Sequence, residues 1–412
     1  MHILYLHQYF CPPDGSGGTR SYEIAVRLVK AGHTVNLITS SAFFPKSYGI
    51  KKTTKLIIDG IKITILHIPY SNKMNKYQRI WAFIKFSLLA TIYAIQQRSI
   101  DLTFATSTPL TIIIPGYIAS KFFKAPLIFE VRDLWPDLPI AIGIIKNRFI
   151  KKITKRLETF AYTQSSTIIA LSPGIKDEII KQAVNPEKIV EIPNACDIAL
   201  FTVKREDKKR FLSQNHYLGT GPLITYAGTI GAINGVEYII YLAEAMLHLD
   251  PKIQFLICGD GAKLEYVKQM AITKNVLNKN TWIIPPLPKN RIPSLLSASS
   301  ACLSLFQPLP EMRHNSANKF FDTLAAGKPI IINYSGWQAE IIEEYGIGLV
   351  LEGYNFPSIA EKIRLLVKDE ELLDQTGQNA LEIAKDKFDR NVLVNKLIKI
   401  IEHKAGNTPS NI

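Results

Sequence analysis

The feature that most constrains the fold is the alternation of short β-branched runs with stretches of helical periodicity along the whole chain. This alternation is typical of βαβ units, in which helices join parallel strands and cover the sheet that they form. A helix is predicted over Thr19–Ala31, because Gly32 follows it in the position of a helix C-terminus. In the first half of the chain the predicted strands are Ile3–Leu6, Thr34–Thr39, Ile61–Ile65, Leu102–Ala105, Leu127–Val131, Thr167–Leu171 and Ile189–Ile192.

The pattern restarts after a change in composition, which indicates a second domain. Pro193–Asp197 and the charged stretch Lys204–Arg210 separate the two sets of strands, and 412 residues are too many for one ordinary core. We predict an α/β protein with two doubly wound domains, 1–197 and 198–390, that face each other across a cleft. Residues 391–412 are expected to form a helix that returns to the first domain, followed by a disordered tail. The predicted strands of the second half are Leu223–Ala227, Gln254–Cys258, Trp282–Ile284, Ala301–Leu305 and Pro329–Ile332.

The composition narrows the classes of partner. There are 49 Lys and Arg residues against 35 Asp and Glu, a formal net charge of +14, which favours nucleic acid, acidic lipid or a phosphorylated substrate. The longest apolar run, 80–95, contains Lys85 and is shorter than the roughly 20 residues of a spanning helix, so membrane insertion is not expected. Isolated reduced thiols are expected, rather than disulfides or a zinc site, because no C-x-x-C spacing links the four cysteines, Cys11, Cys196, Cys258 and Cys302.

A glycine-rich turn, Asp14–Arg20, follows the first predicted strand and leads into a helix. Gly17 and Gly18 allow the backbone to approach a ligand closely, and the helix N-terminus presents N–H groups to an anion. The spacing is not G-x-G-x-x-G, and no acidic residue ends the second strand, which disfavours a dinucleotide. The turn is predicted to contact a phosphate or an acceptor, the alternative being a flexible loop.

Charged residues follow the fifth predicted strand, in the segment Glu130–Asp137. Side chains at the carboxyl end of a buried parallel strand are expected to face a ligand. Arg132 can neutralise phosphate, and Asp133 can orient a sugar hydroxyl or accept a proton; alternatively the two side chains pair with each other. Asp133 and Asp137 have apolar residues between them, which does not predict a metal site.

The segment His314–Pro329 gives the strongest indication of a ligand-binding site in the sequence. Ser316 or Asn318 is predicted to cap a helix that ends at Gly327. Lys319 and Asp322, three residues apart, then lie on one face of this helix.

A carboxylate at Asp322, near the helix N-terminus, can accept both hydroxyl groups of a ribose. The amides just before the helix, at Ser316, Ala317 and Asn318, can hold a diphosphate together with Lys319. The alternative is an ordinary surface ion pair between Lys319 and Asp322.

Two more glycine-rich turns, Ala227–Gly235 and Cys258–Gly261, follow the first two strands of the second half. Each alone is weak evidence, because any turn between a strand and a helix can carry glycine. Together with the helix at Asn318 they are expected to line one crevice. The candidate nucleotide-sugar contacts in these turns and after the next strand are Gly228, Thr229, Asn234, Gly259 and Leu287.

Two basic and partly apolar stretches account for much of the excess charge. Lys73–Lys85 leads into the apolar run with Trp81 and Phe83, and Lys146–Arg156 is a basic amphipathic segment. Such stretches are typical of a peripheral surface on anionic lipid, and the alternative is a solvated helix beside a buried one. Nucleic acid is disfavoured, because the sequence contains no recognised nucleic-acid module. The basic residues expected to face the membrane are Arg148, Lys151, Lys152 and Lys155.

Taken in order, these motifs resemble glycosyltransferase family 4, a retaining family with the GT-B fold, and in particular its bacterial O-antigen and capsule branch, which includes N-acetyl-L-fucosamine transferases. The resemblance covers nearly the whole chain. It rests on Gly17–Arg20, Val131–Pro136, Ser172-Pro173, Pro193-Asn194 with Asp197, Gly228 with Gly231 and Gly235, Gly259–Gly261, and Asn318-Lys319 with Asp322 before Ala325–Pro329.

The resemblance implies two Rossmann-like domains, 1–197 binding the acceptor and 198–390 the nucleotide sugar. It implies a hexosyltransferase that moves N-acetyl-L-fucosamine or a related hexosamine from a UDP-sugar to an undecaprenyl-diphosphate-linked saccharide. Neither a cofactor nor a metal ion is expected, and the enzyme would act in the cytoplasm on the inner face of the bacterial inner membrane. Arg132, Asp133 and Lys319 are the residues expected to act in catalysis.

The sequence departs from the family pattern at several positions. Of the two glutamates that the family usually carries, the second corresponds to Asp322, which would bind the ribose, and the first falls on His314. Thr229 and Asn234 stand where many members place Arg and Lys on the diphosphate. That charge is expected from Lys319 and from Arg313 instead.

Arg132 stands where many members of the family place a histidine that contacts the donor sugar. Two alternatives stay open, the first because it shares the same fold and the second because of the missing Glu, Arg and Lys. One is a UDP-sugar 2-epimerase, and the other is a non-catalytic protein that binds a nucleotide sugar or a lipid.

Overall fold

The computed structural model describes residues 1–412 except 16, 71–73, 203–204 and 407–412. It divides into two compact units, which are described separately. Unit 1 comprises Met1–Pro193, His314–Ser316 and Asn391–Ile412, and unit 2 comprises Asn194–Arg313 and Ala317–Arg390. Ser16 of the glycine-rich turn, Lys73 and Lys204 of the two charged stretches, and most of the tail expected to be disordered lie outside the described residues.

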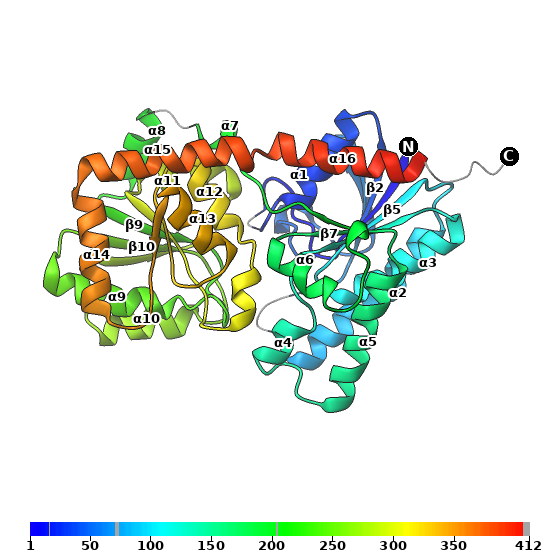
Figure 1. The fold of residues 1–412 in the computed structure, drawn as a ribbon, viewed down its shortest axis with the longest axis horizontal. Coiled ribbons are helices and arrows are strands. Elements are labelled where there is room, and N and C mark those ends of the chain that lie inside the picture. The colour runs from blue at the N-terminus through cyan, green and yellow to red at the C-terminus, as the bar shows by residue number, and fades with distance from the viewer. Residues whose placement is uncertain (16, 71–73, 203–204, 407–412) are drawn as a thin grey trace. The chain divides into compact units, whose positions relative to one another are not determined.

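Unit 1 is built on an eight-stranded sheet with the order β3-β4-β2-β1-β5-β6-β7-β8 (Figure 1). Neighbouring strands run parallel, except that β3 and β4 are antiparallel. The strands are β1 His2–Leu6, β2 Thr34–Ser40, β3 Thr54–Ile58, β4 Ile61–Leu66, β5 Leu102–Thr106, β6 Leu127–Val131, β7 Thr167–Ala170 and β8 Ile189–Glu191.

Helices cover both faces of this sheet, which explains why every residue of the central strands β5 and β6 is buried. One core contains side chains of α2, α3, α5 and α6, and the other contains side chains of α1 and α16. The helices of unit 1 are α1 Arg20–Lys30, α2 Lys76–Ile95, α3 Ile113–Phe123, α4 Asp137–Ala141, α5 Arg148–Gln164, α6 Pro173–Ile180 and α16 Arg390–Gly406.

Unit 2 is built on a six-stranded parallel sheet with the order β11-β10-β9-β12-β13-β14. Its strands are β9 Leu223–Ala227, β10 Gln254–Cys258, β11 Thr281–Ile284, β12 Ala301–Ser304, β13 Ile330–Ile332 and β14 Gly348–Val350. Within this unit α9, α10 and α14 pack on one face of the sheet, and α11, α12, α13 and α15 lie toward the other (Figure 1). The helices are α7 Ile198–Phe201, α8 Arg205–Gln214, α9 Glu237–Leu249, α10 Leu264–Thr273, α11 Ile292–Ala298, α12 Asn318–Ala325, α13 Trp337–Tyr345, α14 Phe356–Lys368 and α15 Glu370–Lys387.

The prediction of two α/β units with doubly wound sheets is confirmed, and every predicted strand is present to within one residue at each end. Two edge strands were missed. β3 forms a hairpin with β4 through Asp59-Gly60, where both residues have positive φ, and this Asp-Gly pair is the local signal that would have predicted it. β14 is three residues long, and Gly348 at its start offers no β-branched side chain.

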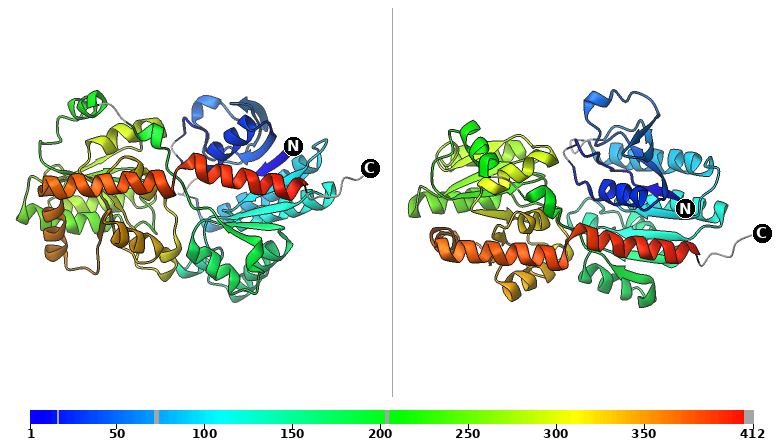
Figure 2. Two further views of the ribbon diagram at one scale, coloured as in Figure 1. Left: turned by 45° about the horizontal axis from the view of Figure 1, so that its top comes forward. Right: turned by 90° about the horizontal axis from the view of Figure 1, so that it is seen from above.

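The last helix, α16, begins at a residue of unit 2 and continues through residues of unit 1. Val394, Leu397 and Ile401 are buried in the core that α16 shares with α1. The two views in Figure 2 show α16 lying along unit 1. Lys396, Lys399, His403 and Lys404 of α16 line a groove together with Val190 of the edge strand β8.

Candidate functional site

The strongest candidate site in unit 2 lies around the first turn of α12. The helix begins at Asn318 with Ala317 as its N-cap. The prediction that Ser316 or Asn318 caps the helix is therefore wrong. The reason is positional, because Ser316 precedes the cap and Asn318 is already the first helical residue. Because alanine offers no side-chain acceptor, no side chain caps the first backbone N–H groups of α12 from the N-cap position. Such N–H groups at a helix N-terminus can bind an anion.

Lys319 extends from this first turn into an aromatic environment. Its Nζ lies 4.8 Å from the ring centroids of both Tyr226 and Phe306 and 3.4 Å from the Tyr226 hydroxyl. Burial lowers the pKa of Lys319 to about 7. A cation held against two rings is stabilised by their π faces but remains poorly solvated, so an incoming anion would strengthen its charged form.

Asp322 lies one turn further along α12 and pairs with Lys289, a residue that the sequence analysis did not single out. Lys289 Nζ is 2.5 Å from Asp322 Oδ1, and the two side chains are 16% and 13% exposed. Lys289 belongs to the short 3-10 helix Lys289–Arg291 and also lies over the Phe201 ring at 5.2 Å. The alternative of a surface pair between Lys319 and Asp322 is therefore wrong, because the carboxylate pairs with Lys289 instead.

The glycine-rich turns of unit 2 pack directly on one another. A Cβ on Gly259 would lie 1.9 Å from the Gly228 carbonyl oxygen, so the two turns approach too closely for any side chain at Gly259. Asn234 is buried, and its Oδ1 accepts a hydrogen bond from the Gly231 amide at 3.2 Å. The side chain of Asn234 is thus used to close its own turn.

The remaining candidate positions near these turns have different surroundings. Thr229 is exposed, and its carbonyl oxygen accepts a hydrogen bond of 2.7 Å from the hydroxyl of Tyr226, which also contacts Lys319. Leu287 is partly buried in the segment after β11, and its backbone forms a hydrogen bond with the thiol of Cys258. Gly228 would carry a Cβ 3.6 Å from Lys319 Cε, so its lack of a side chain leaves room beside this lysine.

In unit 1 the glycine-rich turn leads into an anchored helix. Gly17 donates its amide to Cys11 Sγ at 3.1 Å, and Gly18 is exposed just before Thr19, the N-cap of α1. Arg20, the first residue of α1, is buried and pairs with Glu130 of β6 at 2.8 Å.

The same guanidinium of Arg20 donates to the carbonyl oxygens of Ile192 and Pro193 at 3.0 and 2.6 Å. Arg20 therefore ties the turn, the end of β6 and the segment after β8 together. Its role is to hold the carboxyl edge of the sheet in place, because its donors are committed to these protein acceptors.

Arg132 and Asp133 lie at the carboxyl edge of the unit 1 sheet, as expected for residues that follow β6. Arg132 Nη1 lies 3.3 Å from His7 Nε2, and the Arg132 amide donates to Ser107 Oγ at 3.0 Å. Asp133 Oδ2 accepts a hydrogen bond from Thr108 at 3.3 Å. Desolvation raises the pKa of Asp133 above its usual value, and the charge of Arg132 and the Thr108 bond oppose this rise.

His7 was missed by the sequence analysis. It is buried at the end of β1, and burial together with the neighbouring Arg132 charge holds its pKa well below the usual value. Since Arg132 can only donate, the neutral ring of His7 must accept through Nε2 and carry its proton on Nδ1. His7 therefore orients Arg132 without adding a charge.

The segment His314–Ser316 clusters with unit 1 although its neighbours on both sides cluster with unit 2. The His314 carbonyl oxygen accepts a hydrogen bond of 2.7 Å from Ser172 Oγ, and His314 Nε2 lies 3.9 Å from Glu178. A Cβ on Gly174 would lie 1.9 Å from His314 Nδ1. The histidine at the position of the family's first glutamate thus packs against the start of α6.

The residues expected to face a membrane divide into two groups. Trp81 is 63% exposed on α2, and Arg148 and Lys152 are exposed and Lys151 partly exposed on α5. Phe83 instead packs against Tyr70 and Trp135, with ring centroids 6.4 Å apart in both cases.

Lys155 forms ion pairs within unit 1. Its Nζ pairs with Asp137 at 2.8 Å and with the buried carboxylate of Glu158 at 3.0 Å. Phe83 belongs to an aromatic cluster of unit 1 and is therefore not assigned to the exposed surface. The Lys155 side chain stays 43% exposed while it pairs with these two acids.

The described residues show neither a metal site nor a membrane-spanning helix. Among them, no group of three or more His, Cys, Asp or Glu side chains has the arrangement of a metal site. Across the same residues, no helix is both long and apolar enough to cross a membrane.

Comparison with known protein families assigns each half of the chain. Residues 17–200 match the family described as Glycosyltransferase Family 4, and residues 207–383 match Glycosyl transferases group 1. The two matches therefore cover most of the chain, one on each side of the boundary between the sets of strands.

Similar proteins are also named as glycosyltransferases. The chain is 21% identical over 273 residues to the alpha-D-kanosaminyltransferase of Streptomyces kanamyceticus, covering 66% of this chain and 69% of that protein. It is 21% identical over 298 residues to the GPI3 subunit of the Saccharomyces cerevisiae phosphatidylinositol N-acetylglucosaminyltransferase, covering 72% of this chain but only 60% of that protein.

Among solved structures, Anabaena HepE in complex with UDP aligns with a TM-score of 0.71 at 17% identity, over 98% of this chain and 100% of that one. At this identity the alignment establishes the fold. Together with the two family matches, it shows that the chain is a GT-B glycosyltransferase of family 4, in the hexosyltransferase class, with a Family 4 domain followed by a group 1 domain.

Proposed function

We propose that the protein transfers an N-acetylated hexosamine, with retention of configuration, from a UDP-sugar to a saccharide carried on undecaprenyl diphosphate. The observation that carries the donor assignment is the pair of residues on α12. Lys319 is a cation against two aromatic rings, and Asp322 is a carboxylate one turn along the same helix. One face of a helix thus presents a group for a diphosphate and a group for a ribose.

The donor is proposed to bind unit 2 in one orientation. The diphosphate takes the N-terminus of α12 and Lys319, and the ribose hydroxyls take the Asp322 oxygen that Lys289 does not use. The HepE structure holds UDP, which supports a uridine nucleotide. The similarity to the yeast N-acetylglucosaminyltransferase subunit supports an N-acetylated sugar.

The proposed chemistry needs no nucleophile from the protein. As the bond from the sugar to the diphosphate breaks, Lys319 and the N–H groups of α12 stabilise the charge that develops on the leaving oxygen. That oxygen accepts the proton of the attacking hydroxyl on the same face of the sugar, which retains the configuration. Basic groups carry out the charge stabilisation in this scheme, so we propose that no metal ion is required.

Arg132 and Asp133 are proposed to position the acceptor in unit 1. Arg132 is held by His7, so its guanidinium has a fixed orientation at the end of β6. Asp133 is exposed, so its carboxylate can exchange hydrogen bonds with a hydroxyl of the acceptor.

A lipid-linked acceptor is supported by an exposed apolar surface on unit 1. It spans α2, α3, the segment before α5 and the start of α5, and α2 and α3 pack side by side. Exposed lysines and Arg148 flank it, which suits the anionic inner face of a bacterial membrane. The exposed apolar side chains of this surface are Tyr77, Ile80, Trp81, Ile84, Leu88, Ile92, Ile114, Ile118, Phe122, Ile144, Phe149, Ile150 and Ile153.

The test is UDP release from a panel of UDP-sugars, with and without membrane extract that contains lipid-linked saccharide. The proposal expects release that depends on the extract and is lost in Asp322→Asn, which keeps the size of the side chain. Conversion of the sugar without an acceptor would indicate an epimerase instead. Binding of a UDP-sugar with no turnover in any extract would leave a non-catalytic binding protein.

A further inference from the structure

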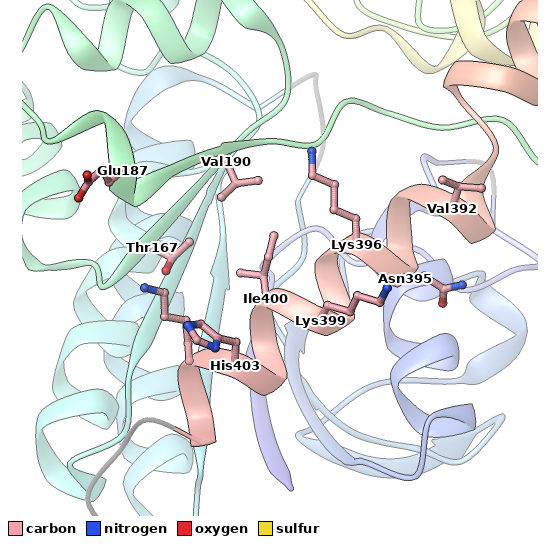
Figure 3. Close-up of a pocket in the computed structure, with 10 residues that line it drawn as sticks. Thr167, Glu187, Val190, Val392, Asn395, Lys396, Lys399, Ile400 and His403 are labelled. Atoms are coloured by element: carbon pink, nitrogen blue, oxygen red, sulfur yellow. The ribbon is translucent and has the colours of Figure 1, made fainter.

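A second basic feature of unit 1 lies apart from the residues assigned above. An open groove of about 730 Å³ runs between α16 and the β7–β8 edge of the sheet (Figure 3). Its floor is partly apolar, formed by Val190 of β8 and Ile400 of α16. None of the residues proposed to bind the donor lines it.

The groove is lined by an excess of positive charge. Lys396, Lys399, His403 and Lys404 all come from α16, and Glu187 is the carboxylate among the lining residues. Lys396 Nζ donates to the Glu191 carbonyl oxygen at 3.2 Å, which fixes it across the groove to the edge strand. In Figure 3 Glu187 lies on the side away from α16, so the charged side chains that the helix contributes to the groove are all basic.

A buried polar group at the base of the groove points to a ligand. Thr167, the first residue of β7, is 1% exposed, and its Oγ1 has no hydrogen-bond partner among the described residues. Buried hydroxyl groups are nearly always hydrogen-bonded, and leaving one unpaired costs free energy. An acceptor atom in the groove would take this hydrogen bond.

We propose that this groove is a binding site for a phosphate group, carried either by a small soluble anion or by a lipid headgroup. Lysine ammonium groups act as point charges for phosphate oxygens, and a threonine hydroxyl supplies a neutral donor beside them. A strand of a partner protein fits less well, because β8 offers only three residues for pairing. A ligand held by both α16 and β7 joins the last helix to the sheet of unit 1.

Inorganic pyrophosphate is the probe for the soluble form, measured by calorimetry on the full chain. The measurement uses Lys319→Gln as the background, so that the candidate donor site does not contribute. Lys399→Gln with Lys404→Gln is expected to weaken binding about tenfold or more, since two charge-assisted contacts are lost. Lys30→Gln, an exposed lysine at the end of α1, is the matched control and is expected to leave the affinity unchanged.

Thr167→Val provides a variant that does not threaten the fold. It removes a hydroxyl that has no partner in the described structure, so the thermal midpoint without ligand is expected to stay the same or rise. Pyrophosphate binding is expected to weaken severalfold. Unchanged affinity in both Thr167→Val and the double lysine variant would overturn the proposed site.

Flotation with vesicles of phosphatidylcholine and phosphatidylglycerol distinguishes the two sources of phosphate. Reduced flotation of the double lysine variant assigns the site to a headgroup. Retained flotation with weakened pyrophosphate binding assigns it to a soluble anion, and retention of both excludes the site. UDP release is expected to persist in Thr167→Val, so failure of this inference and failure of the proposed transferase activity give different results.

Discussion

Lys289 and Asp322 form an ion pair in unit 2, with Nζ 2.5 Å from Oδ1 and both side chains largely buried. The pair joins a short 3-10 helix after β11 to the middle of α12. It leaves one carboxylate oxygen of Asp322 for a ligand. The position of Asp322 therefore depends on a residue more than thirty positions earlier in the sequence.

Removing the lysine of this pair should destabilise the protein. Lys289→Met leaves a largely buried carboxylate without its partner, which we expect to cost about 1–3 kcal/mol in the free energy of unfolding. Urea unfolding measures the loss. Lys268→Met is the control, because the Lys268–Glu265 pair at 3.4 Å is exposed and should contribute less than about 1 kcal/mol. An equal loss in the free energy of unfolding for the two substitutions would contradict the conclusion that Lys289 stabilises the buried carboxylate of Asp322.

The affinity for the donor should fall as the pH rises above neutrality. Lys319 has a pKa of about 7 in the free protein, and a bound diphosphate favours its charged form. Above pH 7 binding must therefore take up a proton, so the dissociation constant should rise by up to about tenfold per pH unit until the pKa of the complex is reached.

Calorimetry with UDP from pH 6 to pH 9, in buffers of different ionisation enthalpy, measures both the affinity and the proton uptake. Lys319→Arg keeps a charge throughout this range and should flatten the dependence. A constant affinity of the wild type across the range would show that Lys319 does not contact the diphosphate.

His7 should act on the reaction through Arg132. His7→Phe keeps a ring of similar shape but removes the acceptor for Arg132 Nη1, and we expect kcat/KM for the acceptor to fall about tenfold. His7→Gln supplies an acceptor oxygen and should restore part of the loss, with KM for the donor unchanged in both variants. An equal loss in the two variants would point to a purely structural role for His7.

The apolar surface of unit 1 should hold the protein on anionic vesicles. Trp81→Ser with Leu88→Ser removes two exposed side chains from α2, and we expect co-sedimentation with phosphatidylglycerol vesicles to fall severalfold. Ile57→Ser is the control, because Ile57 is 69% exposed but lies on the edge strand β3, outside this surface. If the control loses as much binding as the α2 variant, the surface is not the membrane contact.

The strands were predictable because their signal is local. A buried parallel strand such as Ile330–Ile332 consists of consecutive apolar residues, with Pro329 before it and Asn333 after it. β14 was missed because three residues that begin with Gly348 carry too little of this signal, and its pairing is decided by the neighbouring strand β13.

The site was predictable only where its residues lie close together in the sequence. Lys319 and Asp322 share a helix, so their spacing of three residues revealed a common face. Lys289 and His7 lie far from their partners in the sequence, and each is an ordinary residue in its own segment. Their roles follow from the packing of separate elements, as does the packing of Phe83 against Trp135.

The most direct test of the account is UDP release by the wild type and by Asp322→Asn, with a panel of UDP-sugars and a lipid-linked saccharide. The account predicts that one UDP-N-acetylhexosamine gives release only when the acceptor is present, and that Asp322→Asn lowers this release at least tenfold while remaining folded. Release that does not depend on the acceptor, or that is equal in the two proteins, would contradict it.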